Sequence, residues 1–147
     1  MALACANIAA LDRIMAWLQA SIRAYQTVGV ETVLSTGKYR PLVVEAKDLG
    51  FEVSLLYVTL KTAEMNVERV QLRVAQGGHA VDEERIRTRR ERSFRQLPWF
   101  LDQADRALIF DNSGSTPRII AQKAAGTIQI DSDAPKEIVT AVEALSE

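Results

Sequence analysis

The stretch FEVSLLYVTL, residues 51–60, decides the fold class of this chain. Its side chains are almost continuously apolar, with many β-branched and aromatic types, which is typical of a strand buried on both faces. A helical pattern with Pro41 in its first turn precedes the strand over residues 38–50. A second helical pattern follows over residues 62–76, with Thr62 as a suitable N-cap. A buried strand between two helices predicts an α/β fold.

The rest of the chain repeats this alternation of helices and strands. Hydrophobic periodicity predicts further helices over residues 3–26, 82–95, 98–103, 116–124 and 135–146, and further strands over residues 28–34, 107–113 and 127–131. We therefore expect one α/β domain over residues 1–147, built on a mainly parallel sheet flanked by helices. In such sheets the functional side chains gather at the carboxyl ends of the strands.

Composition excludes several classes of protein. The 147 residues are 48% hydrophobic and 25% charged with a net charge of −1, which argues against binding to nucleic acid driven by overall charge. The single cysteine, Cys5, excludes an internal disulfide framework and fits a reducing compartment. The first residues do not resemble a signal peptide, and no window approaches the roughly 18 apolar residues that span a bilayer. We expect a cytoplasmic protein without a membrane or nucleic-acid partner.

Arginines concentrate in one segment, RVAQGGHAVDEERIRTRRERS, residues 73–93, and its flanks. Eight of the 13 arginines fall between Arg69 and Arg95. Helical spacing places Arg90 on the same inward face as Ile86 and Phe94, and predicts an exposed pair between Arg87 and Glu91. A run of charges is usually a solvated face, but an inward arginine needs an anionic partner. Several guanidinium groups beside a Gly-Gly turn suit phosphate binding under a mobile flap.

Four other positions each admit two interpretations. Glu31 lies in an apolar segment, so its carboxylate must either pair with a cation or face a cleft. His79, the only histidine, has no neighbours that would complete a metal site, and is either a turn residue or a general base. Residues 35–39, STGKY, lack the spacing of a phosphate-binding Walker A loop and favour an ordinary helix start. Residues 110–114, FDNSG, form either a turn or a ligand-lining edge.

Three blocks in this order and spacing resemble the zeta-toxin-like family of P-loop kinases. The blocks are ETVLST, NVERVQLRVAQGGHAVDEERIRTRRERSF and FDNSG, and the resemblance extends from about Val30 to Gly126. It implies a P-loop kinase-like fold and phosphoryl transfer from ATP or GTP with Mg²⁺ to an acceptor such as UDP-N-acetylglucosamine. The implied partners are a nucleotide and a small-molecule acceptor.

The resemblance also implies roles for individual residues. Residues 69–95 would form a lid over the nucleotide, in which Arg73, Arg89 and Arg90 neutralise charge on the transferring phosphoryl group. Glu31 and Thr32 would line the acceptor pocket. The nucleotide itself would be bound by Arg69, His79 and Asn112, with Asn112 near the base. No metal ligand is expected among these residues.

The sequence departs from the family pattern in two ways. The family's Walker A strand, loop and helix and its catalytic Asp would precede residues 28–34, and this sequence contains neither, so we expect a partial domain without kinase activity. Asp82 stands where relatives carry proline.

Two functions are alternatives to an inactive kinase domain. One is a non-catalytic module that binds a nucleotide or phosphorylated ligand, and the other is a fragment that binds itself or an antitoxin-like partner. Without a central strand, we expect Val30–Leu34 to pair directly with Val53–Val58, because this would satisfy both backbone edges.

Overall fold

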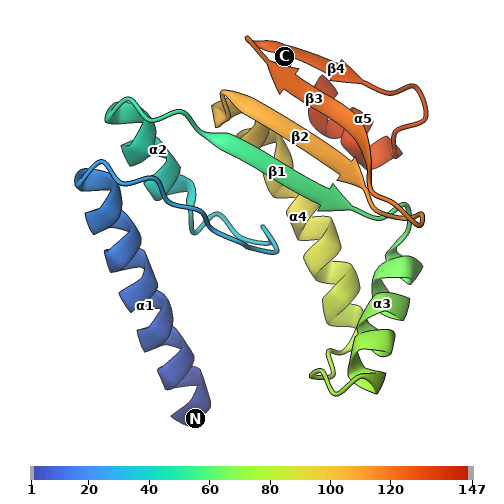
Figure 1. Ribbon diagram of the computed structural model, residues 1–147. Coiled ribbons are helices and arrows are strands. Elements are labelled where there is room, and N and C mark those ends of the chain that lie inside the picture. Colours follow the sequence, from blue (N-terminus) through green and yellow to red (C-terminus); the bar gives the residue numbers. More distant parts are fainter. Residues whose placement is uncertain (1, 146–147) are drawn as a thin grey trace.

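The computed structural model describes residues 2–145, which form helices and a sheet (Figure 1). The elements in chain order are α1 (Ala2–Arg23), α2 (Arg40–Asp48), β1 (Ser54–Thr59), α3 (Ala63–Ala75), α4 (Glu83–Gln103), β2 (Arg106–Asp111), β3 (Arg118–Ala124), β4 (Thr127–Ile130) and α5 (Lys136–Glu143). The expected α/β class is confirmed, and no helix in this part of the chain is long and apolar enough to cross a bilayer.

The sheet is mixed, so the expectation of a mainly parallel sheet is wrong. Its strand order is β1-β2-β3-β4, in which β1 and β2 are parallel and the other two pairs are antiparallel. Residues 116–124 were predicted as a helix, but Arg118–Ala124 form β3 instead. The reason is the turn at Ala125 and Gly126, which have φ values of 49° and 76°. Positive φ at both central residues is typical of a type I′ turn, which joins adjacent antiparallel strands.

The helix α4 is longer than expected. Two helices were predicted on either side of residues 96–97, but the structure has one helix that continues through Pro98. A proline removes one backbone hydrogen bond and disturbs the preceding turn. Here the flanking side chains of Leu97, Phe100 and Leu101 are buried in the main core. Their packing offsets the cost of the proline and keeps the helix continuous.

The helices α4 and α5 cover one face of the sheet (Figure 1). Ile109 on β2 and Ile138 on α5 are almost completely buried in this layer. On the opposite face, Leu56 and Val58 of β1 remain 69% and 59% exposed. The expectation that residues 51–60 are buried on both faces is therefore wrong, because no described helix covers the second face.

Residues 28–34, predicted as a strand, belong to no sheet. Within the described residues no backbone hydrogen bond joins residues 30–34 to residues 53–58, so the predicted direct closure onto β1 is also wrong. The side chain of Leu34 is instead buried in the main core, in the same cluster as Ile22 of α1 and Leu42 of α2. Leu34 has a φ of 56°, and its N–H donates to Thr32 Oγ1 at 3.1 Å, so this turn interrupts an extended conformation.

Candidate functional site

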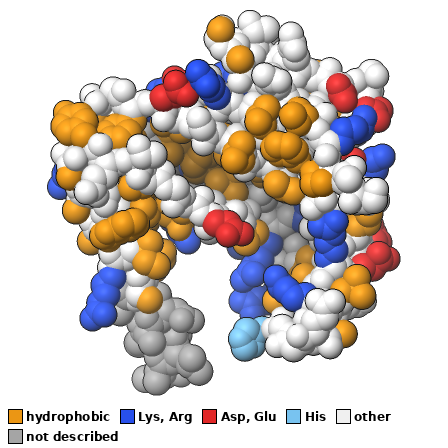
Figure 2. Space-filling model, viewed as in Figure 1, with side chains coloured by type: hydrophobic (Ala, Val, Ile, Leu, Met, Phe, Trp, Pro, Cys, Tyr) orange, Lys and Arg blue, Asp and Glu red, His pale blue; other side chains and the backbone are white. Residues whose placement is uncertain are grey.

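A groove of about 790 Å³ separates β1 from the segment 29–34. All six residues of β1 line one side, residues 29–34 line the other, and side chains of α3 and α4 complete the wall. Five of the residues predicted from the sequence meet here, namely Glu31, Thr32, Arg73, Arg89 and Arg90. Figure 2 shows this hollow between the part carrying α1 and α2 and the part carrying the sheet, with Lys and Arg side chains at its lower end.

Local sequence fixes where the two arginine-bearing helices end and begin. The N–H of Gly78 donates to Arg73 O at 2.9 Å and that of Gly77 donates to Val74 O at 3.0 Å, which together form a Schellman motif at the end of α3. A Cβ on Gly78 would lie 2.8 Å from Arg73 O, so only glycine fits there. Asp82 is the N-cap of α4 and accepts from Arg85 N at 3.2 Å. The Gly-Gly pair is thus a helix C-cap that precedes a well-capped second helix.

Arg90 points inward, as its helical position predicted, but protein groups occupy its guanidinium. Nη1 donates to Asn66 Oδ1 at 3.0 Å and to Thr59 Oγ1 at 3.4 Å, while Nη2 donates to Lys61 O at 3.3 Å. Nη2 also lies 3.5 Å from Glu137 Oε1, and the side chain is only 10% exposed. Arg90 therefore joins α4 to the end of β1, to α3 and to α5.

Arg73 and Arg89 differ from Arg90 because their side chains are exposed in the groove. Among the described residues, neither guanidinium has a hydrogen-bond or ion-pair partner within the distances expected for such contacts. Arg73 comes from the last turn of α3 and Arg89 from the first half of α4, so two helices place two cations on one wall. Among the described residues, Glu31 is the only carboxylate that lines this groove, and it is exposed and comes from the opposite wall. Of its two interpretations, facing a cleft is the one that the structure favours.

Arg87 is part of a different contact from the one predicted. It pairs with Glu83 at 2.7 Å and with Glu64 at 2.6 Å, not with Glu91, and so joins the first turn of α3 to the first turn of α4. Glu83 precedes Arg87 by one helical turn, which is the favoured orientation for a Glu–Arg pair. The hydrogen bond from Arg87 lowers the pKa of the Glu64 carboxyl below its ordinary value.

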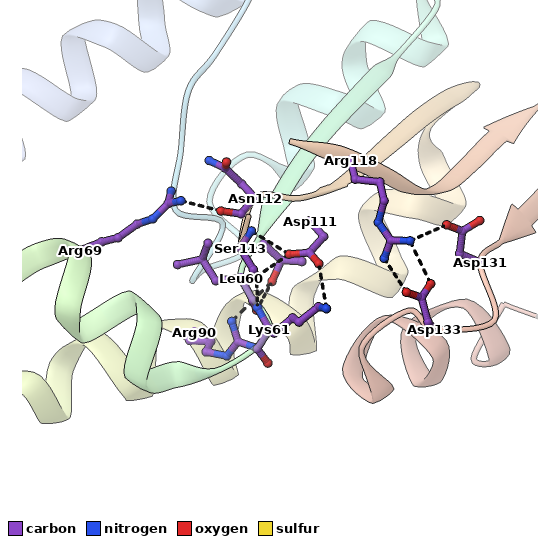
Figure 3. Close-up of polar contacts among 11 residues, drawn as sticks. Leu60, Lys61, Arg69, Arg90, Asp111, Asn112, Ser113, Arg118, Asp131 and Asp133 are labelled. Carbon is purple, nitrogen blue, oxygen red and sulfur yellow. Dashed lines mark hydrogen bonds and ion pairs between the residues drawn. The ribbon is translucent and has the colours of Figure 1, made fainter. Parts of the chain in front are cut away.

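A second polar cluster lies at the carboxyl ends of β1 and β2 (Figure 3). The buried Asp111 accepts from Ser113 N at 2.9 Å and from Ser113 Oγ, and the same Oγ accepts from Lys61 N at 2.8 Å. These bonds hold residues 111–113 in a turn, which confirms the turn interpretation of FDNSG. Arg69 Nη2 donates to the backbone oxygen of Asn112 at 2.5 Å.

The structure does not bring all predicted nucleotide-binding residues into the groove. Arg69 and Asn112 contact each other in the cluster of Figure 3, and neither lines the groove. His79 is exposed in the turn between α3 and α4 and also lies outside the groove lining. The predicted site therefore separates into a groove with three arginines and an edge cluster with Arg69 and Asn112.

Tyr57 and Asn66 are polar groove residues that were not identified from the sequence. The Tyr57 hydroxyl lies 2.9 Å from Ser93 Oγ, and burial raises the pKa of Tyr57 above its ordinary value. Asn66 carries the amide oxygen nearest to Arg90. A tyrosine within an apolar strand and an asparagine within a helix do not by themselves indicate a site.

Comparison with protein families, with curated proteins and with solved structures found no match to this chain. The chemistry of the groove therefore has to be inferred from its own residues. Guanidinium groups match phosphate oxygens, and Arg73 and Arg89 both line this groove. For Mg²⁺ the described residues contain no cluster of three or more carboxylate, histidine or cysteine ligands.

Proposed function

We propose that the groove binds a phosphate-bearing small molecule, with the phosphate between Arg73 and Arg89. The observation that carries this proposal is the contrast among the three groove arginines. Arg90 is occupied by four protein oxygens, whereas Arg73 and Arg89 have no partner among the described residues. A phosphate in this groove would thus find two guanidinium groups that can donate to its oxygens.

The reaction class that we propose for this site is phosphoryl transfer of the zeta-toxin type. ATP or GTP would be the donor and a sugar nucleotide such as UDP-N-acetylglucosamine the acceptor, with Arg73 and Arg89 neutralising charge on the phosphoryl group. Glu31 and Thr32 lie across the groove, where the acceptor would bind. The sequence contains no Gly-x₄-Gly-Lys-Ser/Thr loop. We therefore expect this chain to bind the phosphate group without hydrolysing or transferring it.

A non-catalytic binding module is the second candidate. It is favoured by the scarcity of carboxylates in the groove, since Glu31 is the only one that lines it. Phosphoryl transfer to a hydroxyl needs a base or a positioning group near the acceptor, whereas binding needs only the cations. The two candidates share the same phosphate contacts, and only the kinase-type candidate needs an acceptor beside Glu31 and Thr32.

Isothermal titration with pyrophosphate, Mg·ATP, Mg·GTP and UDP-N-acetylglucosamine tests the proposal. Arg73→Ala and Arg89→Ala should each weaken binding at least tenfold, because each loses a charge-assisted contact of about 1.5–3 kcal/mol. Arg95→Ala is the matched control for Arg89→Ala. Arg95 is exposed on α4, as Arg89 is, and carries the same charge, but it does not line the groove. If Arg89→Ala and Arg95→Ala lose the same affinity, binding depends on overall charge alone and the proposed site is wrong.

A turnover assay tests the expectation, common to both candidates, that this chain binds phosphate without transferring it. The wild-type chain should release no phosphate from ATP or GTP above a buffer control, because the phosphate-binding loop is not in its sequence. Phosphate release that Arg89→Ala abolishes and Arg95→Ala preserves would instead show that the groove is catalytic.

A further inference from the structure

The strand β1 is an edge strand whose open edge forms a wall of the groove. It pairs only with β2, and every residue from Ser54 to Thr59 lines the groove. A strand of six residues is about 20 Å long. Backbone N–H and C=O groups along such an edge are a template for pairing with another extended chain. A small phosphorylated ligand between two arginines would leave most of this edge without a partner.

The groove continues beyond the arginines into an apolar section. A second cavity of about 410 Å³ adjoins the first and shares Gly29, Val30, Thr32, Leu34, Ser54 and Leu55 with it. Its other lining residues include Ile22, Leu42, Phe51 and Phe100. The two sections together are lined by every residue from Phe51 to Thr59, so the hollow follows β1 along its whole length.

Two kinds of exposed side chain border this hollow. Leu56 and Val58 on β1 are 69% and 59% exposed, and Val33 on the opposite wall is 58% exposed. Such neighbouring exposed apolar residues mark interaction sites more often than free surface. Arg73 and Arg89 give the α3 and α4 side of the groove a positive charge that Glu31 only partly balances.

We propose that this groove accepts an extended segment of a partner protein, which adds to the sheet as a strand beside β1. Backbone hydrogen bonds to the open edge provide affinity, and alternate side chains provide specificity. The segment is apolar at the positions that extend the surface of Leu56 and Val58, and acidic where it faces Arg73 and Arg89. The contacts with the edge of β1 are additional to the proposed phosphate contacts, whereas Arg73 and Arg89 are shared, so phosphate and the acidic side chains would compete for them.

The test uses a blocked eight-residue peptide with valine at alternate positions and two glutamates among the intervening ones. It is titrated into the ¹⁵N-labelled chain, and exchange of backbone amides with solvent is followed. Binding should be saturable and should slow exchange of amides in β1. The same peptide, N-methylated throughout, has no N–H donors and should bind at least tenfold more weakly.

A pair of protein variants checks the location. Val58→Lys places a charge on the exposed wall of the groove and should weaken peptide binding at least tenfold. Val44→Lys is the control, because Val44 is 44% exposed on α2 and does not line either cavity. Both residues are exposed, so neither change should prevent folding.

Three outcomes would overturn the proposal. Equal affinity for the N-methylated peptide would exclude strand addition. Effects confined to Arg73 and Arg89, with no change in the amides of β1, would show that the glutamates bind through charge alone. A chain that dimerises through β1, with no peptide binding at any concentration, would show that a second copy occupies the edge.

Discussion

Arg90→Ala should destabilise the fold, because Arg90 joins four elements through a nearly buried guanidinium. Its contacts are Asn66 on α3 at 3.0 Å, the backbone oxygen of Lys61 at 3.3 Å, Thr59 at the end of β1 at 3.4 Å and Glu137 on α5 at 3.5 Å. The guanidinium also lies 4.7 Å from the centre of the Phe94 ring. Alanine removes all these contacts at once.

The size of the effect follows from these contacts. Removing one member of a buried charged network costs about 3–5 kcal/mol, and the longer distances to Thr59 and Glu137 favour the lower end. We therefore expect a loss of about 3 kcal/mol in the free energy of unfolding. For a chain of this length each kcal/mol shifts Tm by about 2–4 °C, so Tm should fall by about 6–12 °C. Arg90→Lys keeps the charge but not the planar fork, and should recover less than half of the loss.

Thermal and urea unfolding, followed by circular dichroism, measure the effect. Arg89→Ala is the control, because Arg89 is the next residue, carries the same charge and is exposed. A surface change of this kind should alter stability by less than about 0.5 kcal/mol. If Arg90→Ala melts within 2 °C of wild type, or if Arg89→Ala is equally destabilised, the separation between a structural Arg90 and a ligand-binding Arg89 is wrong.

Two further predictions concern the ends of α3. Gly78→Ala should lower the free energy of unfolding by more than about 1 kcal/mol in urea titrations, because its Cβ would lie 2.8 Å from Arg73 O. Gly29→Ala is the control and should be close to neutral, because a Cβ there would have no atom within 4 Å. The hydrogen bond with Arg87 lowers the pKa of Glu64 in the folded state. The ion pair should therefore stabilise the fold above the pKa of an unfolded Glu, about 4.3, and this stabilisation should be lost as the pH falls through the lower pKa of the folded state. Wild type and Glu64→Gln should thus converge in urea midpoint as the pH falls from 6 to 2.5, and a constant difference would contradict the pairing.

The sequence predicted the elements of this fold better than their arrangement. The helices that contain Pro41 and Thr62 and the strands at residues 54–59 and 106–111 were recognised, because local periodicity and capping determine them. The strand predicted over residues 28–34 does not form, although its β-branched residues favour one. Strand formation needs a partner edge, and pairing between distant segments is not encoded in the local pattern.

The candidate site shows the same division. Helical spacing predicted that Arg90 points inward, and this is confirmed by its contacts with Asn66 and Thr59. Spacing did not predict that these protein groups would occupy its guanidinium, because the acceptors come from α3 and β1. The predicted pair of Arg87 with Glu91 was wrong for a related reason. Arg87 pairs instead with Glu83 on its own helix and with Glu64 on α3, and the position of α3 could not be predicted from spacing within α4.

The measurement that tests the phosphate site most directly is an NMR titration with pyrophosphate that observes the arginine Nε–H signals. The signals of Arg73 and Arg89 should shift together and saturate, because one anion lies between the two guanidinium groups. The signals of Arg95 and Arg118, which lie outside the groove, should not move by a comparable amount. Uniform small shifts of all arginines, or a saturating shift at Arg118 alone, would contradict phosphate binding in the groove between β1, α3 and α4.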